Sequence, residues 1–134
     1  MQIKNKIILY FFIIFFSSNL ILKADEFNIS AKEIMFDKNN NVVTGVGEVE
    51  VTSKDGKVIK SEKVIYKKES EFLTVEGNVE FFDTLGNVLK TKKATYDKKK
   101  EIVNTYENSK LKTDNGYIIS SKNIVYKIKD KILI

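Results

Sequence analysis

The chain repeats itself with a period of 30 residues, and this repetition constrains its fold more than any other feature of the sequence. Tyr66, Tyr96 and Tyr126 follow one another at this interval, and Phe36 stands one interval before the first of them. The period runs from residue 29 to residue 134 without an insertion or a deletion. Repetition of this kind predicts several copies of one small structural unit that stack on one another.

Each unit has the pattern of two β-strands joined by a tight turn. The first strand alternates apolar and polar residues, most clearly over residues 73–81, and a period of two is typical of a sheet with one buried and one solvated face. The turn contains a glycine, which adopts the positive φ that a hairpin needs. These turn glycines are again 30 residues apart, at Gly56, Gly86 and Gly116.

We therefore predict an all-β, antiparallel chain of about four hairpin units, with seven strands in residues 27–126 and the start of an eighth at residues 132–134. A three-residue loop at Gly56 would pair Val51 with Ile59, whereas a two-residue loop would move every side chain to the other face. With the three-residue loop, the residues predicted to face inward are Val43, Val49, Val51, Ile59, Ile65, Leu73, Val75, Val79, Phe81, Leu89, Val103, Leu111 and Ile119.

The composition excludes much of enzyme chemistry. The sequence contains no His, Cys, Pro or Trp, so neither a catalytic triad with His, nor a Cys nucleophile, nor a Cys/His zinc site can form. The sequence pattern gathers no pair of carboxylates and contains no phosphate-binding loop. We therefore expect no enzyme activity, no catalytic residue, no cofactor and no bound metal.

The excess of positive charge does not indicate a nucleic-acid-binding protein. The net charge is +5 at pH 7, but Lys4, Lys6 and Lys23 precede residue 25, which leaves 20 basic residues against 18 acidic ones. A nucleic-acid-binding domain would concentrate its positive charge in the folded part. The remaining lysines stand beside turns and alternate with acids, which is typical of solvated loops and strand edges.

Residues 1–24 have the layout of a secretory signal peptide, with a basic start, an unbroken apolar run over residues 7–16 and Ala24 at the expected cleavage position. The apolar run is shorter than the roughly 20 residues that a membrane span needs. An uncleaved anchor over residues 7–22 is the alternative. Either segment would deliver residues 25–134 across a membrane, and without Cys the fold there would have no disulfide bonds.

The sequence ends three residues into a predicted strand. By the period, Ile132, Leu133 and Ile134 match the opening of the first strand of another unit. We expect either that the domain over residues 25–134 is truncated at its C-terminal edge, or that its last strand is an open edge. An open edge strand can extend the sheet of a partner, so these three residues are the predicted partner contact.

Two short motifs recur in phase with the period. Val75-Glu76-Gly77-Asn78-Val79 is an example of the first, and residues 91–97, TKKATYD, are an example of the second, which residues 61–66 and 121–126 repeat in part. Behind an export signal, these motifs resemble the OstA-like repeat domain of the lipopolysaccharide transport (Lpt) proteins, a family that includes LptA, LptC and the N-terminal periplasmic domain of LptD. The third unit departs from the pattern, with Glu107-Asn108-Ser109 in place of the Gly-Asn-Val of the second.

The resemblance covers residues 27–134 and implies a V-shaped β-jellyroll, or β-taco. In this family the apolar groove of the jellyroll shields lipopolysaccharide acyl chains during transfer across the periplasm to the outer membrane. The inward residues named above would then line a lipid groove. The implied partners are lipopolysaccharide and other Lpt-type β-jellyroll proteins, joined edge to edge by β-augmentation. A cleaved signal would favour an LptA-like protein, an uncleaved one an LptC-like protein, and the unfinished strand an LptD domain without its barrel.

The residues by themselves leave two alternatives open. The inward side chains could form a closed, dry core without a ligand, because most apolar strand faces are simply core. The exported repeat could also be a structural or adhesive module that associates with itself through its edge strands and binds no lipid. The tyrosines of the repeat are interpreted as cross-strand packing at strand ends.

Overall fold

The computed structural model describes residues 26–128 and the backbone of residues 132 and 133. The predicted signal peptide or anchor over residues 1–24, and Ile134 of the predicted partner contact, lie outside the described residues. Every described element is a β-strand, and all strand pairs are antiparallel, as the sequence predicted. Within the described residues, we find no helix whose length and hydrophobicity would let it cross a membrane.

The described residues form more strands than the sequence predicted. The strands are β1 (Phe27–Ser30), β2 (Glu33–Asp37), β3 (Val42–Ser53), β4 (Val58–Lys67), β5 (Phe72–Phe82), β6 (Val88–Asp97), β7 (Ile102–Tyr106), β8 (Ser109–Lys112), β9 (Ile118–Ser121), β10 (Val125–Lys127) and β11 (Ile132–Leu133). The difference arises because three predicted strands are each broken in the middle. They become the pairs β1 and β2, β7 and β8, and β9 and β10.

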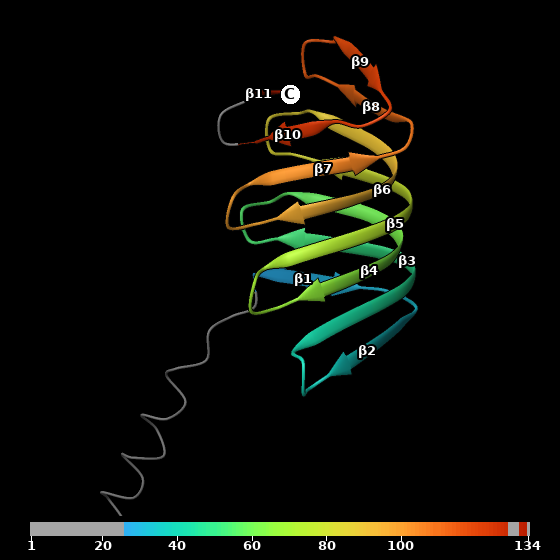
Figure 1. The fold of residues 1–134 in the computed structure, drawn as a ribbon, viewed down its shortest axis with the longest axis vertical. Helices are drawn as coiled ribbons and strands as arrows, with labels where there is room; N and C mark the ends of the chain where they lie inside the picture. The colour runs from blue at the N-terminus through green and yellow to red at the C-terminus, as the bar shows by residue number, and fades with distance from the viewer. Residues whose placement is uncertain (1–25, 129–131, 134) are drawn as a thin grey trace, which may run out of the picture.

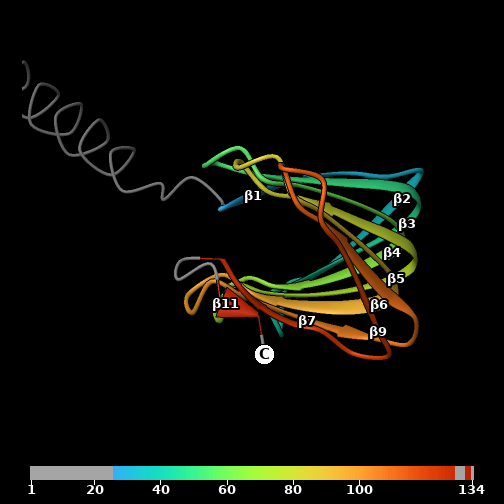
Figure 2. The ribbon, with the colours of Figure 1, turned by 90° about the horizontal axis from the view of Figure 1, so that it is seen from above.

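The sheet folds over on itself into two layers that are joined along one side and diverge toward the other (Figure 2). The upper layer holds β1, β8, β9 and the halves of β3 to β6 next to the turns at Gly56 and Gly86; the lower layer holds the other halves with β2, β7, β10 and β11. We call the joined side the spine and the opposite side the mouth. The units stack along the long axis, from β1 and β2 at one end to β9 and β11 at the other (Figure 1).

The strands bend at the spine because each long strand pair contains an irregularity there. The register shifts between Val46 and Val49 in β3, and the same shift recurs one period later between Glu76 and Val79 in β5. Gly77 has a φ of +83° at this corner, a conformation that costs glycine little. In the third unit Glu107 occupies the equivalent place with a φ of +64°, and the strand breaks there into β7 and β8. Extra residues of this kind kink a strand and increase its twist.

The core lies between the two layers and runs the length of the stack. It contains the apolar residues Phe27, Val49, Val51, Ile59, Val64, Tyr66, Leu73, Val75, Val79, Phe81, Leu89, Ala94, Tyr96, Val103, Leu111, Ile124, Tyr126 and Ile128. Aromatic rings join the layers at the N-terminal end, where the Phe27 ring meets the Tyr66 ring edge to face with centroids 5.1 Å apart. Such pairs stabilise a core by about 0.5–1.5 kcal/mol beyond the area they bury.

Candidate functional site

The space between the layers is the candidate site, and most residues predicted to face inward lie there. The predicted register is confirmed, because Val51 pairs with Ile59 and Val49 with Ser61. Ten of the thirteen predicted residues are no more than 2% exposed: Val49, Val51, Ile59, Leu73, Val75, Val79, Phe81, Leu89, Val103 and Leu111. The side chains of the two layers therefore fill the slot between them. That these residues contact lipid stays a prediction.

Ile65 is a correction, because it lies on the outer face. The corner of β4 places Glu62 and Lys63 on the outside together, so the inward positions change from Ile59 and Ser61 to Val64 and Tyr66. A strand that gains one residue at a bulge reverses its faces beyond that point. The prediction carried the alternation straight through the corner and therefore selected Ile65.

The remaining two predicted residues mark the ends of the slot. Val43 is half-buried and packs against the core from the lower layer. Ile119 pairs with Leu111 and so shares its inner face, but it is 38% exposed because β9 is an edge strand of the upper layer. Sequence reasoning missed the tyrosines Tyr66, Tyr96 and Tyr126 as inward residues, although their 30-residue interval was the clearest signal in the chain.

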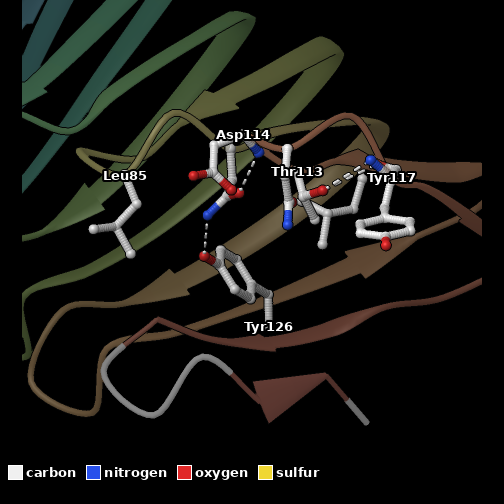
Figure 3. A pocket seen from close by; sticks show the side chains of 8 residues that line it. Leu85, Thr113, Asp114, Tyr117 and Tyr126 are labelled. Atoms are coloured by element: carbon white, nitrogen blue, oxygen red, sulfur yellow. Dashed lines mark hydrogen bonds between the residues drawn. The ribbon is translucent and has the colours of Figure 1, made fainter.

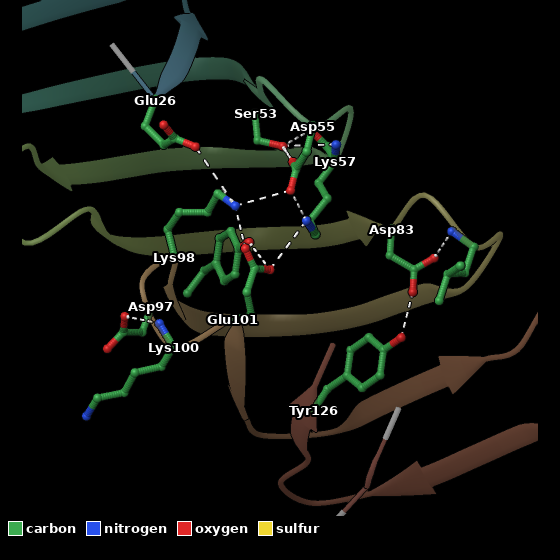
Figure 4. Close-up of polar contacts among 12 residues, drawn as sticks. Glu26, Ser53, Asp55, Lys57, Asp83, Asp97, Lys98, Lys100, Glu101 and Tyr126 are labelled. Atoms are coloured by element: carbon green, nitrogen blue, oxygen red, sulfur yellow. Dashed lines mark hydrogen bonds and ion pairs between the residues drawn. The ribbon is translucent and has the colours of Figure 1, made fainter. Parts of the chain in front are cut away.

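A cluster of charged residues joins the two layers across the mouth (Figure 4). We call it the mouth clasp; it consists of Glu26, Asp55 and Lys57 at the tip of the upper layer and Lys98 and Glu101 at the tip of the lower layer. Lys98 Nζ lies 3.1 Å from Asp55 Oδ2 and 3.9 Å from Glu26 Oε1. Lys57 Nζ lies 3.3 Å from Glu101 Oε2 and also pairs with Asp55. Each lysine therefore contacts a carboxylate of the opposite layer.

The clasp is held in its charged form. Burial acts to raise the pKa of the Glu101 carboxyl, but hydrogen bonds from Lys98 and Tyr96 and the charge of Lys57 outweigh it and hold the pKa below its usual range. The pKa of Asp55 lies well below its usual range for the same reason, with Lys57, Ser53 and Lys98 as donors against the effect of burial. The side chain of Lys57 is only 7% exposed, so its charge depends on these carboxylates for compensation.

A second polar contact closes the mouth farther along the stack. The Tyr126 hydroxyl of β10 donates a hydrogen bond of 2.6 Å to Asp83 Oδ2 in the turn after β5 (Figure 4). Asn87 Nδ2 donates to the same carboxylate oxygen at 2.7 Å. Burial acts to raise the pKa of Asp83, but these donors outweigh it and lower the pKa. The lower layer thus reaches the upper one in two places along the mouth.

The slot reaches the surface at the C-terminal end, in a pocket of about 430 Å³ (Figure 3). Leu111 and Tyr126, which belong to the core, line its inner side, and Leu85 and Tyr117 line its rim. Tyr117 is 69% exposed and Leu85 is 43% exposed. This pocket combines an apolar floor with an open side, which is typical of small-molecule sites. Within the described part of the chain, no group of three or more Asp and Glu residues is arranged to hold a metal ion.

Apolar side chains are also exposed at the edges of the sheet. All of β2 is exposed, with Met35 at 57% and Ile34 at 51%. At the other end of the stack β9 is exposed as well, with Ile118 at 57%. β11 follows β10 at the end of the lower layer, where Leu133 pairs with Tyr126 and Ile132 with Lys127. Edge strands of this kind are available for pairing with another chain.

Comparison with known proteins is consistent with this architecture. The family described as "OstA-like protein" matches residues 13–134. A solved structure with the same fold is LptH of Pseudomonas aeruginosa, described as the LptA-homologous periplasmic component of the lipopolysaccharide transport device. It is 19% identical, superposes with a TM-score of 0.72, and the match covers 84% of this chain and 85% of LptH. No curated protein matches the chain. Because the family match extends over nearly the whole sequence, the chain belongs to the OstA-like family.

Proposed function

We propose that this protein is a non-enzymatic transport module that binds lipopolysaccharide and shields its acyl chains in the slot between the layers. The observation that carries this proposal is the apolar lining, which continues without interruption from Phe27 at one end of the stack to Leu111 at the other. Membership of the OstA-like family and the likeness to a lipopolysaccharide transport component support the class of ligand.

Acyl chains can occupy the slot only when the layers part, because side chains fill the space between them. The mouth clasp and the Tyr126–Asp83 hydrogen bond are the polar contacts that opening would break. Burial of an acyl chain provides a compensating gain of about 0.8 kcal/mol per methylene group. A chain of about ten methylene groups would therefore gain roughly 8 kcal/mol, enough to offset the loss of several ion pairs.

We further propose that the protein acts in the periplasm and transfers lipopolysaccharide toward the outer membrane together with other β-jellyrolls of its family. The exposed strands β2 and β9 lie at opposite ends of the stack and offer unpaired edges. Pairing of such edges would extend the sheet and the slot from one molecule to the next. Self-association without lipid, as in an adhesive module, is the competing function, and the same exposed edges favour it.

Photocrosslinking at two phenylalanines of β5 tests the proposal. Phe81 is 2% exposed and faces the slot, whereas Phe72 is half-buried on the outer face of the lower layer. Benzoylphenylalanine replaces either residue with a related aromatic side chain, and each full-length protein is exposed to lipopolysaccharide and light. We expect adducts at Phe81 and none at Phe72.

The outcomes separate the two functions. Adducts confined to Phe81 support a lipid-binding slot. Equal adducts at both positions would indicate nonspecific adhesion of lipid to the surface and contradict the proposal. No adducts at either position, in variants whose circular dichroism shows a folded β-protein, would favour the adhesive module.

A further inference from the structure

The repeat changes its charge on the outer face of the upper layer. Glu50 in the first unit and Glu80 in the second stand at the same place of the period, but the third unit has Lys110 there. Glu62 is likewise followed at its place by Lys92 and Lys122. These side chains are exposed or half-buried and alternate with the inward residues of their strands. The outer face therefore becomes more positive from the N-terminal to the C-terminal end of the stack.

Pairing of the strands makes the change unfavourable for folding. Glu50, Lys60, Glu80 and Lys90 stand directly opposite one another in successive strands, so that acids and bases alternate. Lys110 then stands opposite Lys90 and repeats the sign of its neighbour. Like charges in directly opposed positions destabilise a sheet by up to about 1 kcal/mol. The third unit thus gives up a favourable pairing that the first two units retain.

A pocket of about 360 Å³ lies at this positive end of the layer. Its apolar lining comes from Phe82, Val88 and Ile118, which are neighbours across the strands together with Lys112. The charged residues around it are Glu80, Lys90, Lys110 and Lys112. Three ammonium groups and one carboxylate therefore surround an apolar floor.

The outer face of the lower layer provides a comparison within the same molecule. There Lys63, Glu76 and Lys93 stand in one row and alternate in sign, and Lys93 Nζ lies 3.3 Å from Glu76 Oε1. A generally lysine-rich composition would affect both outer faces alike. The accumulation of unbalanced lysines is instead local to the upper layer, beside exposed apolar residues.

We propose that this patch, formed by Phe82, Val88, Lys90, Lys110, Lys112 and Ile118, docks the protein on an anionic phospholipid bilayer. Lysines attract the anionic headgroups, and the apolar side chains between them enter the boundary of the acyl region. The exposed Tyr117 and Leu85 lie beside the C-terminal pocket at the same end of the stack, and aromatic side chains are favourable at a membrane surface. The patch lies outside the slot, so bilayer docking is independent of the lipid cargo.

Vesicle sedimentation tests the docking surface. The full-length protein without its first 24 residues' apolar run would leave out part of the chain, so the whole chain is used with its terminus blocked equally in all variants by the same detergent-free refolding. The test variant carries Lys110→Glu and Lys112→Thr, which restore the residues that earlier units have at these places, namely Glu80 and Thr52. The control variant carries Lys38→Glu and Lys99→Thr in turns of the lower layer and has the same net charge.

We expect the wild type and the control to bind vesicles of phosphatidylcholine mixed with phosphatidylglycerol more tightly than vesicles of phosphatidylcholine alone. A lysine close to an anionic bilayer contributes roughly a fivefold factor in affinity. The test variant should therefore bind the anionic vesicles at least about 25-fold more weakly than the control. Because its substitutions restore the alternation of charge, it should unfold at the same temperature as the wild type or higher.

Two results would overturn the proposal. Equal binding of the test variant and the control would place the contact elsewhere on the chain. Loss of lipopolysaccharide adducts at Phe81 in the test variant, with vesicle binding unchanged, would assign the lysines to the phosphates of the cargo instead. If the test variant keeps its Phe81 adducts and loses only vesicle binding, docking and cargo binding are separate functions.

Discussion

Removal of the ammonium group of Lys57 should weaken the mouth of the protein and leave its slot intact. Lys57→Met keeps most of the aliphatic stem and deletes the group that links Asp55 in the upper layer to Glu101 in the lower one. The two carboxylates would then share Lys98 as their remaining basic partner within the clasp. We expect the layers to separate more readily at their tips.

Burial sets the size of the effect. At 3.3 Å, the separation of Lys57 Nζ and Glu101 Oε2, the Coulomb attraction is about 1 kcal/mol at the dielectric constant of water and about 5 kcal/mol at an effective value of 20. The side chains are 7% and 19% exposed, so the pair lies between an exposed pair, worth about 0.2–1 kcal/mol, and a buried one, whose disruption costs about 3–5 kcal/mol. Since Lys98 remains, we expect a loss of about 2 kcal/mol, or a melting temperature lower by about 10 °C.

A double-mutant cycle isolates this pair from the rest of the clasp. Urea unfolding is measured for Lys57→Met, for Glu101→Gln and for the two together, and the coupling energy should be at least about 1 kcal/mol. The chain contains a matched control, because Lys32 Nζ and Glu48 Oε1 are also 3.3 Å apart but their side chains are 66% and 80% exposed. The same cycle at the control pair should give no more than about 0.5 kcal/mol.

Equal coupling energies at the two pairs would refute the reasoning, because distance is the same and burial is the only large difference between them. Spin labels on the two tips give a second measurement. With labels at Lys54 and Lys100, the distance distribution should broaden toward longer values in Lys57→Met and stay unchanged in Lys32→Met. An unchanged distribution in both would show that the clasp does not hold the layers together.

Three further predictions concern pH, the corners and the second mouth contact. Asp55, Asp83 and Glu101 have lowered pKa values in the folded protein, so the unfolded chain binds more protons in acid; stability should be constant above the ordinary carboxyl pKa of about 4 and fall as the pH drops below it. Urea midpoints that stay constant down to about pH 2 would contradict this. Gly77→Ala should cost about 2 kcal/mol or more, because its φ is +83° and a Cβ would lie 2.7 Å from Glu62 Cβ, whereas Gly116→Ala, with φ of +91° and open space around it, should cost about 1 kcal/mol; thermal unfolding of the two variants tests the difference, and equal losses would reject the steric argument. Tyr126→Phe removes the hydrogen bond to Asp83 and should cost about 1.5–3 kcal/mol by urea unfolding, while Tyr106→Phe, at an exposed tyrosine, should stay within about 0.5 kcal/mol; a similar loss for both would mean that the Asp83 contact contributes little.

The periodicity of the sequence was sufficient to predict the architecture. It predicted antiparallel strands, the turns at Gly56 and Gly86, and the pairing of Val51 with Ile59, all of which the structure contains. These features follow from local rules, since a glycine turn of fixed length determines the register of the strands on either side. Family resemblance added the V shape, which alternation alone did not predict.

The corners and the mouth could not be predicted in the same way. Gly47 and Gly77 repeat as regularly as the turn glycines, but within an alternating strand they were taken as ordinary strand positions, so the change of face at Ile65 was missed. The mouth clasp joins Asp55 to Lys98, which are 43 residues apart. Charged residues near turns are usually solvated, and only the packing of two layers brings these together.

The corners also explain why the mouth should control the spacing of the layers. Ladder pairing is interrupted at the spine between Val46 and Val49, between Lys60 and Lys63 and between Glu76 and Val79. A strand pair that is already irregular there loses few backbone hydrogen bonds when it bends further. The core side chains resist separation along the whole slot, but lipid acyl chains can replace those apolar contacts with equivalent ones. Acyl chains cannot replace the ion pairs of Lys57 and Lys98, so the clasp is the part of the closed state that lipid must overcome without compensation in kind.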